Sequence, residues 1–214
     1  NSVRVIILAG AGKHFCAGHD LSESIIASKD PTRKREANIA ASEMIMSINR
    51  CPKPVIARIQ GVATAAGCQL AASCDLVFAS TAAKFATPGV NIGLWCLAPQ
   101  VAVSRTIAQK HAMQMLLTGK MIDAEQAVRF GLANEAIEAE VLDDRILEIA
   151  REIAGKSSLA VAMGKESFYR QLEMDVPEAY AMVDELIYRA IQTEDAQEGI
   201  SAFLEKRDPK WKGR

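Results

Sequence analysis

The stretch KPVIARIQGVATAAGCQLAASCDLVFAS, residues Lys53–Ser80, decides the fold. Its first part, Val55–Ile59, is a short apolar run behind two prolines and is typical of a buried strand. Ala65–Ala72 contains good helix formers and no proline, so we expect a short helix that begins near Ala66. Asp75–Ser80 has an apolar centre and predicts another strand. The stretch therefore predicts a strand, a loop of small residues, a helix and a strand.

The start of this helix has a functional interpretation. Because the first amides of a helix have no partner within it, a buried helix start offers unpaired N–H donors. Together with the helix dipole, such donors suit a negative charge that develops during a reaction. An ordinary β-α-β corner explains the same residues equally well, and both interpretations stay open at this point.

Composition excludes several classes of protein. The 214 residues are half hydrophobic, which suffices for one large core or for one domain with an appendage. The net charge of −1 gives no basic footprint for nucleic acid, and the apolar runs are too short for a bilayer, so we expect neither partner. His14, Cys16 and His19 lack a second pair of ligands at usable spacing, so we predict no metal site. An odd number of cysteines without framework spacing favours a reducing compartment; they are Cys16, Cys51, Cys68, Cys74 and Cys96.

The rest of the chain predicts an α/β core followed by helices. The expected elements are a strand at Val3–Gly10, a mobile segment from Ser22 that leads into a helix from Arg35 to Ile48, a short strand at Lys84–Thr87, a loop at Pro88–Trp95, helices at Leu97–Gln109, His111–Leu117 and Asp123–Phe130, and a strand at Leu132–Ile137. Asp123 is expected to cap its helix and Gly131 to end it. We predict a core at residues 1–140 and a helical oligomerisation region at 141–214. Since neither a methionine nor a targeting peptide precedes the first strand, we also expect that a leading segment is missing.

Several motifs occur in an order that resembles one family. They are FCAGHDL at Phe15–Leu21, the stretch Lys53–Ser80, FATPGVNIGL, LTGKMIDAEQAVRFGLANEAI, and AQEGISAFLEKRDPKWKGR at the C-terminus. Together they cover almost the whole chain and resemble the enoyl-CoA hydratase/isomerase (crotonase) superfamily. The resemblance implies a spiral of ββα units with a C-terminal helical subdomain, a further unit before Asn1, acyl-CoA thioester substrates, and a homotrimer or homohexamer. It implies no cofactor, because coenzyme A is part of the substrate.

The resemblance also assigns residues to a site. Two backbone amides, which correspond to His19 and Ala66, would hold the thioester oxygen as it becomes an enolate. Phe203 and Lys206 would lie near the nucleotide end of coenzyme A, although a packed aromatic ring and a solvated lysine explain them equally well. The substrate would also contact residues around the two amides: Cys16, Ala17, Gly18, Asp20 and Gly67.

Two departures from the family weaken the prediction of hydration. Hydratases of the family use two glutamates, and Gln69 and Gly89 stand at those positions here. Neither residue has a proton to transfer near neutral pH, so neither serves as a general acid or base. The side chains considered as replacements for the glutamates are Asp20, Glu23 and the imidazole of His19. Gln69 and Asn91 are expected to orient water or a substrate carboxylate by hydrogen bonding. Cys68 and Cys96 are expected to be packing residues, and Asp75 and Asp123 are expected to have structural roles.

The sequence therefore predicts a protein that binds acyl-CoA thioesters and stabilises a thioester enolate, nominally in fatty-acid metabolism. We expect a lyase or isomerase of this family with weak or altered hydratase activity. The alternatives are a non-catalytic acyl-CoA-binding paralogue, a crotonase-type decarboxylase, a thioester hydrolase, and an α/β domain unrelated to coenzyme A. The expected location is the cytoplasm if the source is bacterial and the mitochondrial matrix if it is eukaryotic.

Overall fold

The central stretch forms the strand, helix and strand that the sequence predicts, with one further strand between them. In the computed structural model these are β2 (Val55–Ile59), α3 (Ala66–Ser73) and β4 (Leu76–Ser80). The additional strand, β3 (Val62–Thr64), is too short for its residue pattern to be recognised. The structure describes residues 2–27 and 29–214; the prediction of a missing segment before Asn1 lies outside the described residues.

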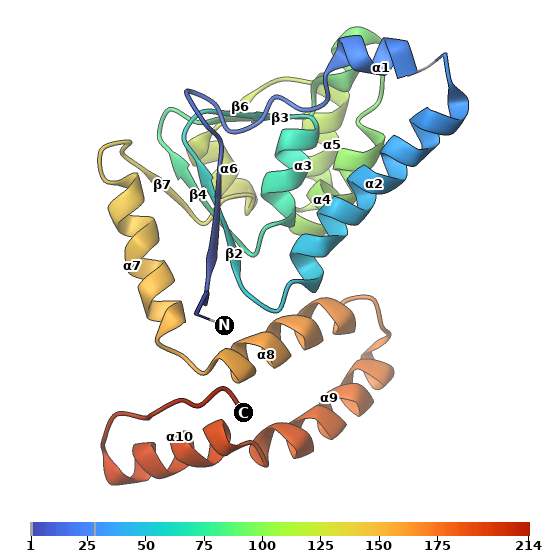
Figure 1. The fold of residues 1–214 in the computed structure, drawn as a ribbon. Coiled ribbons are helices and arrows are strands. Elements are labelled where there is room, and N and C mark those ends of the chain that lie inside the picture. The colour runs from blue at the N-terminus through green and yellow to red at the C-terminus, as the bar shows by residue number, and fades with distance from the viewer. Residues whose placement is uncertain (1, 28) are drawn as a thin grey trace. The chain divides into compact units, whose positions relative to one another are not determined.

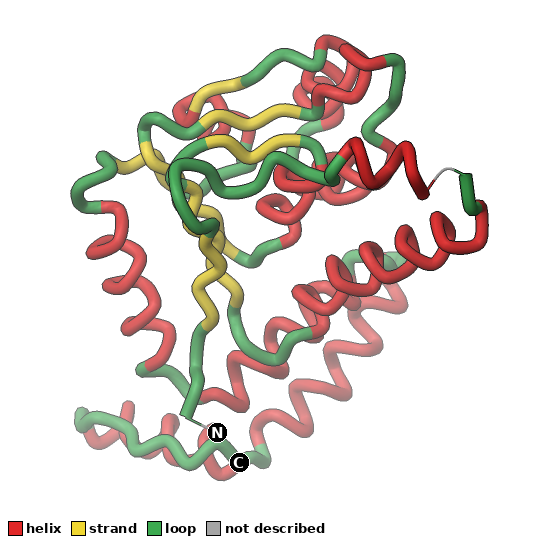
Figure 2. Tube along the Cα trace, turned by 45° about the horizontal axis from the view of Figure 1, so that its top comes forward, coloured by secondary structure: helices red, strands yellow, loops and turns green. Residues whose placement is uncertain are grey.

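Seven strands form two sheets in the described part of the chain (Figure 2). The first sheet has the order β1-β2-β4-β7, and β2 pairs with β4 in parallel, Ile56 opposite Leu76. In the second sheet β3 lies parallel to β5, with Thr64 opposite Ala86, and β6 runs antiparallel to β5. The other strands of the two sheets are β1 (Ile6–Ala9), β5 (Lys84–Ala86), β6 (Ile122–Asp123) and β7 (Glu135–Ile137). Parallel strands joined by helices confirm the predicted α/β class.

The chain divides into two compact units, residues 7–48 with 55–147, and residues 1–6 with 49–54 and 148–214. In the first unit, α3 and α4 (Leu97–Thr106) lie side by side (Figure 1), and the Thr106 hydroxyl donates to the Ala72 carbonyl. The largest side chains that are almost fully buried there include Phe85, Ile56, Ile59, Met115 and Leu132. The remaining helices of this unit are α1 (Leu21–Ala27), α2 (Pro31–Arg50), η1 (Pro88–Ile92, a 3₁₀ helix), α5 (Gln109–Thr118) and α6 (Ala124–Phe130), while α7 (Leu142–Ala154) continues past its boundary.

The predictions for residues 22–48 and 88–95 need correction. Helix α2 begins at Pro31, not at Arg35, because proline is well suited to the first helical position and Asp30 caps it. Asp30 Oδ1 accepts hydrogen bonds from the amides of Thr32 and Arg33, both at 3.1 Å. A further helix, α1, stands where an irregular segment was expected. The predicted loop at Pro88–Trp95 begins with the 3₁₀ helix η1.

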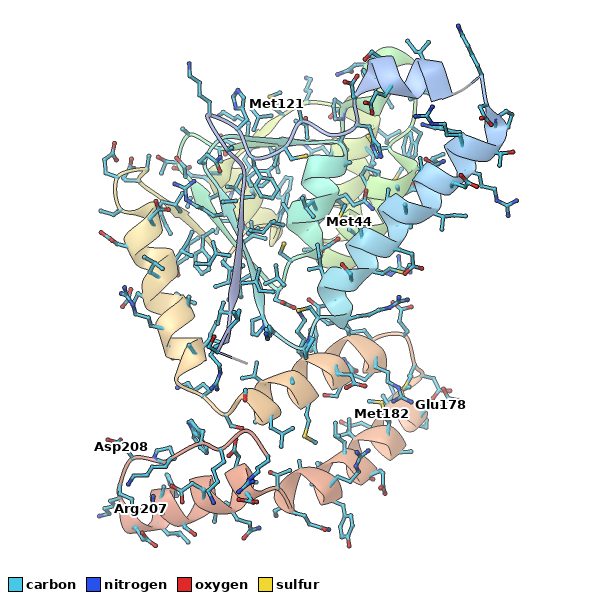
Figure 3. The ribbon with its side chains drawn as sticks, viewed as in Figure 1. Met44, Met121, Glu178, Met182, Arg207 and Asp208 are labelled. Atoms are coloured by element: carbon cyan, nitrogen blue, oxygen red, sulfur yellow. The ribbon has the colours of Figure 1, made fainter. Side chains whose placement is uncertain are left out.

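The second unit contains α8 (Ser158–Gln171), α9 (Val176–Ile191) and α10 (Glu194–Glu205). Each of these helices has a capping side chain, from Ser157, Asp175 and Thr193 respectively. After α10 the chain turns back at the labelled residues Arg207 and Asp208 (Figure 3). Buried Asp195 holds this tail, because its carboxylate accepts the amides of Lys212 and Gly213. The three helices and the tail enclose an apolar groove of about 740 Å³.

Candidate functional site

The start of α3 has an unusual backbone. Ala65, the N-cap of α3, has φ 50° and ψ −120°, and no side chain of the described residues caps the helix in its place. A positive φ is unfavourable for a residue with a Cβ atom and costs roughly 1–3 kcal/mol in such a region. Surrounding hydrogen bonds hold the conformation: the Ala65 amide donates to the Ala86 carbonyl at 3.0 Å, and the Ala65 carbonyl accepts the amide of Gln69. These hydrogen bonds therefore maintain a strained backbone conformation at the start of α3.

The segment before Asp20 lies directly against this helix start. The Thr64 amide donates to the Cys16 carbonyl at 3.0 Å, and the Thr64 hydroxyl donates to the Ala17 carbonyl at 3.1 Å. Gly18 has φ 101°, and a Cβ atom there would lie 3.0 Å from Ala65 Cβ. A Cβ atom on Gly67 would lie 2.0 Å from the Cys16 carbonyl oxygen, which no side chain tolerates. Both glycines are thus required for the two backbone segments to approach each other.

This approach brings the two predicted amide donors into neighbouring segments. Ala66 is the first residue of α3, His19 directly follows Gly18, and a Cβ atom on Gly18 would be 3.3 Å from the Ala66 nitrogen. Within the described residues, neither the His19 amide nor the Ala66 amide donates to any acceptor. Unpaired amides at a helix start stabilise negative charge, since they and the helix dipole are already oriented. This arrangement is chemically suited to an oxyanion.

The two positions at which the sequence predicts substituted glutamates, 69 and 89, differ in their surroundings. Gln69 lies one turn into α3 and is 8% exposed, so its side chain is packed in the interior. Gly89 lies in η1 and does not have a positive φ, but it is crowded. A Cβ atom there would lie 3.0 Å from both Cys96 Sγ and the Leu94 carbonyl oxygen. A side chain at position 89 is therefore limited by space and not by backbone conformation.

Comparisons with known proteins agree with this architecture. A family model described as "Enoyl-CoA hydratase/isomerase" matches residues 1–214. The chain belongs to the enoyl-CoA hydratase/isomerase family. It is 42% identical to enoyl-CoA hydratase domain-containing protein 3, mitochondrial, from Homo sapiens, over 99% of this chain and 69% of that protein, and 35% identical to carnitinyl-CoA dehydratase from Proteus mirabilis, over 100% and 83%. Among solved structures it resembles an enoyl-CoA hydratase from Mycobacterium smegmatis, with a TM-score of 0.94, 45% identity and coverage of 98% of this chain and 81% of that one.

Membership of the family confirms the crotonase-like α/β fold that the motifs predict. The structure of the human domain-containing protein 3 superposes with a TM-score of 0.93 at 42% identity, over 98% of this chain and 82% of that one. Some of these relatives are named as hydratases or dehydratases. The family therefore includes enzymes.

Of the side chains considered as replacement acids or bases, Asp20 is occupied by hydrogen bonds. Asp20 Oδ1 accepts the hydroxyl of Ser22 at 2.6 Å, the Ser22 amide at 2.8 Å and the Glu23 amide at 3.4 Å. These hydrogen bonds, the hydroxyl's first, lower the pKa of Asp20, so Asp20 is an ionised cap of α1. Burial raises the pKa of the Cys68 thiol to about 12, with a smaller contribution from Cys96, so Cys68 stays neutral. The side chains of His19 and Glu23 are exposed.

Two of the predicted structural roles are confirmed. Asp75 Oδ2 accepts the Val55 amide at 2.7 Å and so joins the ends of β4 and β2. Asp123 accepts the amide of Gln126 at 2.8 Å and caps α6, which ends at Gly131 with φ 83°. Asn91 is exposed and donates to the Gly119 carbonyl at 3.4 Å.

Phe203 and Lys206 lie in the unit that contains α8–α10, whereas the other predicted site residues lie in the other unit. Phe203 is 82% exposed and borders the apolar groove, so the alternative of a packed aromatic ring does not hold within one chain. Lys206 ends α10 with φ 57°, the second positive φ among the described non-glycine residues.

Two residues of the site region, Ala65 and Cys96, have features that no pattern in the sequence indicates. No local pattern marks Ala65, because alanine rarely adopts a positive φ and its conformation results from tertiary contacts. Cys96 is buried, as expected of a packing residue, and its sulfur also accepts the amide of Gly89 at 3.3 Å. No group of three or more His, Cys, Asp or Glu side chains suited to a metal occurs among the residues described. Likewise, no helix in that part of the chain is long and apolar enough to cross a membrane.

Proposed function

We propose that this chain binds an acyl-CoA thioester and stabilises its enolate with the backbone amides of His19 and Ala66. The thioester carbonyl oxygen would accept both N–H groups, and its charge would increase as the α-carbon loses a proton or another substituent. Cys16, Ala17, Gly18, Asp20 and Gly67 would form the surrounding wall. The place of the chain in acyl-CoA metabolism follows from the same proposal.

The observation that supports the proposal most strongly is the strained, uncapped start of α3. Ala65 adopts φ 50° and ψ −120°, and the Ala66 amide behind it has no acceptor in the described residues. A conformation of this cost persists only where surrounding structure enforces it, and such conformations concentrate at functional sites. Gly18 and Gly67 lack side chains where a Cβ atom would separate the two amide-bearing segments.

The residues that stand at the two predicted acid positions favour a weak hydratase activity. Buried Gln69 and crowded Gly89 transfer no proton. A general acid or base at such a position is commonly worth roughly a hundred- to ten-thousand-fold in rate. For the same reason the second candidate is a reaction that relies on oxyanion stabilisation without an acid at these positions, namely decarboxylation through an enolate or thioester hydrolysis through a tetrahedral oxyanion, together with acyl-CoA binding without turnover. A lyase or isomerase of the family remains the proposed class.

A Gln69→Glu variant tests this function. The substitution is nearly isosteric and places a carboxylate one turn from the Ala66 amide, so hydration of a short 2-enoyl-CoA should rise at least about tenfold above a very slow wild-type rate. Gln114→Glu, on the exposed surface of α5, is the matched control and should leave the rate unchanged. Loss of the enoyl thioester absorbance measures the rate. A wild-type rate typical of a competent hydratase would show that another residue carries the proton, whereas absence of binding to any acyl-CoA would reject the proposed function itself.

We also propose that the chain assembles as a homotrimer or homohexamer through its helical region. Large apolar side chains of α9 and α10 are exposed in the single chain: Tyr180, Ile187, Tyr188, Ile191, Ile200, Phe203 and Leu204. Exposed apolar surface of this extent is characteristic of an interface. Light scattering at micromolar concentration should give three or six times the mass of the chain, and a monomer would contradict the proposal.

The proposed cellular location depends on whether the source organism is a eukaryote or a bacterium. Relatives from vertebrates are named as mitochondrial proteins, so we propose the mitochondrial matrix if the source is eukaryotic and the cytoplasm if it is bacterial. Fractionation of source cells would test this proposal.

A further inference from the structure

Cys96 takes part in an unusual contact. It is the N-cap residue of α4, but its side chain caps no α4 amide in the described structure. Its sulfur accepts the amide of Gly89 at 3.3 Å instead, and Cys96 is only 8% exposed. The thiol therefore faces back toward η1, at the position where the family's second glutamate would stand.

The same sulfur occupies the direction that a side chain at position 89 would take. A Cβ atom on Gly89 would lie 3.0 Å from Cys96 Sγ, 3.0 Å from the Leu94 carbonyl oxygen and 3.1 Å from the Cys96 nitrogen. Such distances require the neighbours to shift by a few tenths of an ångström. The Leu94 carbonyl belongs to a backbone segment fixed by the hydrogen bond from the Leu94 amide to the Gly89 carbonyl at 2.9 Å. Of the three neighbours, Cys96 Sγ is thus the one that a substitution removes.

We infer that Cys96 is a specificity-determining residue of the thioester site, which acts through Gly89. It fills the wall beside Gly89 and thereby keeps both a carboxylate and a water molecule out of that place. The inference rests on the proposed function, because it requires that Gly89 face the bound thioester. With this wall closed, the site stabilises the enolate but receives no proton from this side, which favours reactions in which the α-carbon loses carbon dioxide or another group without an enzyme acid.

A double-mutant cycle measures the steric contact between positions 89 and 96 without any ligand. Its four proteins are the wild type, Gly89→Ala, Cys96→Ala and the double variant. In the wild-type background Gly89→Ala adds one methyl group to a filled space and should lower the thermal midpoint by at least about 3 °C. In the Cys96→Ala background the same change should cost measurably less, since the sulfur is gone while the contacts with the Leu94 carbonyl oxygen and the Cys96 nitrogen remain. Cys74→Ala, a buried cysteine that follows the last residue of α3, is the control and should not alter the effect of Gly89→Ala.

The second arm tests specificity. Gly89→Glu alone should bind acyl-CoA poorly and hydrate a short 2-enoyl-CoA less than about threefold faster than wild type, whereas Gly89→Glu with Cys96→Ala should gain at least about tenfold. Cys96→Ser retains an acceptor for the Gly89 amide and a smaller atom, so the gain with it should be intermediate. Equal gains for Gly89→Glu with and without Cys96→Ala would overturn the inference.

The two arms separate the inference from the function on which it rests. Binding of acyl-CoA by the wild type, with no coupling between positions 89 and 96, would overturn the role of Cys96 alone. Coupling in the thermal cycle without acyl-CoA binding by any variant would overturn the proposed function, and with it the role of Cys96 in the reaction.

Discussion

Helices α3 and α6 both follow a short strand of the three-stranded sheet and both begin with alanine, yet their starts differ. At α6, Asp123 has ordinary extended dihedral angles, its side chain accepts the Gln126 amide at 2.8 Å, and the Gln126 side chain accepts the Asp123 amide at 3.3 Å. At α3, Ala65 has φ 50°, and no described side chain caps the helix. One start has a complete capping box, and the other has none.

The difference separates a helix start built for stability from one built for access. A capping side chain typically stabilises a helix by about 1 kcal/mol, whereas the Ala65 conformation costs roughly 1–3 kcal/mol. Asp at position 65 would have capped the amide of Gly67 or Cys68, as Asp123 caps that of Gln126, but it would also have placed a carboxylate beside the Ala66 amide, where it would compete with a ligand. We interpret the uncapped start as the arrangement that keeps the Ala66 amide available for a ligand.

The largest expected effect is at Gly67, which allows the two segments of the α3 site to touch. Gly67→Ala would place its Cβ atom 2.0 Å from the Cys16 carbonyl oxygen, and we expect a loss of about 3 kcal/mol or more in the free energy of unfolding. Gly164→Ala, in α8 where nothing lies within 4 Å, should instead stabilise by about 0.5–1 kcal/mol. Urea denaturation measures both variants. A tolerated Gly67→Ala would mean that the close approach of Cys16 to α3 is not required.

The next effect concerns the caps themselves and should have opposite signs at the two helices. Ala65→Gly removes the Cβ atom responsible for the strain and should stabilise the protein by about 1 kcal/mol. Asp123→Ala removes the capping box of α6 and should destabilise it by about 1 kcal/mol. For a chain of this size each change corresponds to about 2–4 °C in thermal midpoint. Destabilisation by Ala65→Gly would contradict the presence of strain at α3.

The smallest effect is expected from the side chains beside the predicted amides. Asp20→Asn keeps an acceptor for the α1 amides, and His19→Ala removes only an exposed imidazole. Both variants should retain acyl-CoA binding within about threefold, because the contact comes from the backbone. Isothermal titration with an acyl-CoA checks this result. A loss in His19→Ala as large as that caused by a change of the backbone would identify the imidazole as the true contact.

The ionised Asp20 also predicts a pH dependence. Because the pKa of Asp20 is lowered in the folded chain, its cap is fully present above the usual carboxyl value of about 4 and is lost only as the pH falls through the lowered pKa. The amide chemical shift of Ser22, followed by nuclear magnetic resonance, reports this titration. A transition at or above the usual value would show that Asp20 is not held by the Ser22 hydroxyl and amides.

Local patterns predicted much of this fold, because the chemistry that decides them is local. The bounds of β2 and the start of α3 follow from an apolar run and from helix formers, and Asp123 and Gly131 delimit α6. The start of α2 at Pro31 was missed because proline was treated as a break when it stood at the first helical position.

The sequence did not predict the parts of the site that depend on contacts between distant segments. The dihedral angles of Ala65 result from its hydrogen bond to Ala86 and from the packing of Gly18. The role of Cys96 depends on a contact with Gly89 across η1. Both features involve small side chains, and small side chains carry little pattern by which tertiary contacts could be inferred.

Replacement of the Ala66 amide by an ester, through an α-hydroxy acid at that position, tests the central claim most directly. The change removes the N–H donor but keeps the side chain, and the same replacement at Ala124, the first residue of capped α6, is the control. Acetoacetyl-CoA supplies the readout, because its enolate absorbs in the near ultraviolet and forms without any enzyme acid. We predict that the Ala66 ester lowers the ratio of bound enolate to bound keto form at least about tenfold, while the Ala124 ester leaves it unchanged. An unchanged ratio in the Ala66 ester, with the protein folded and the ligand bound, would contradict the account.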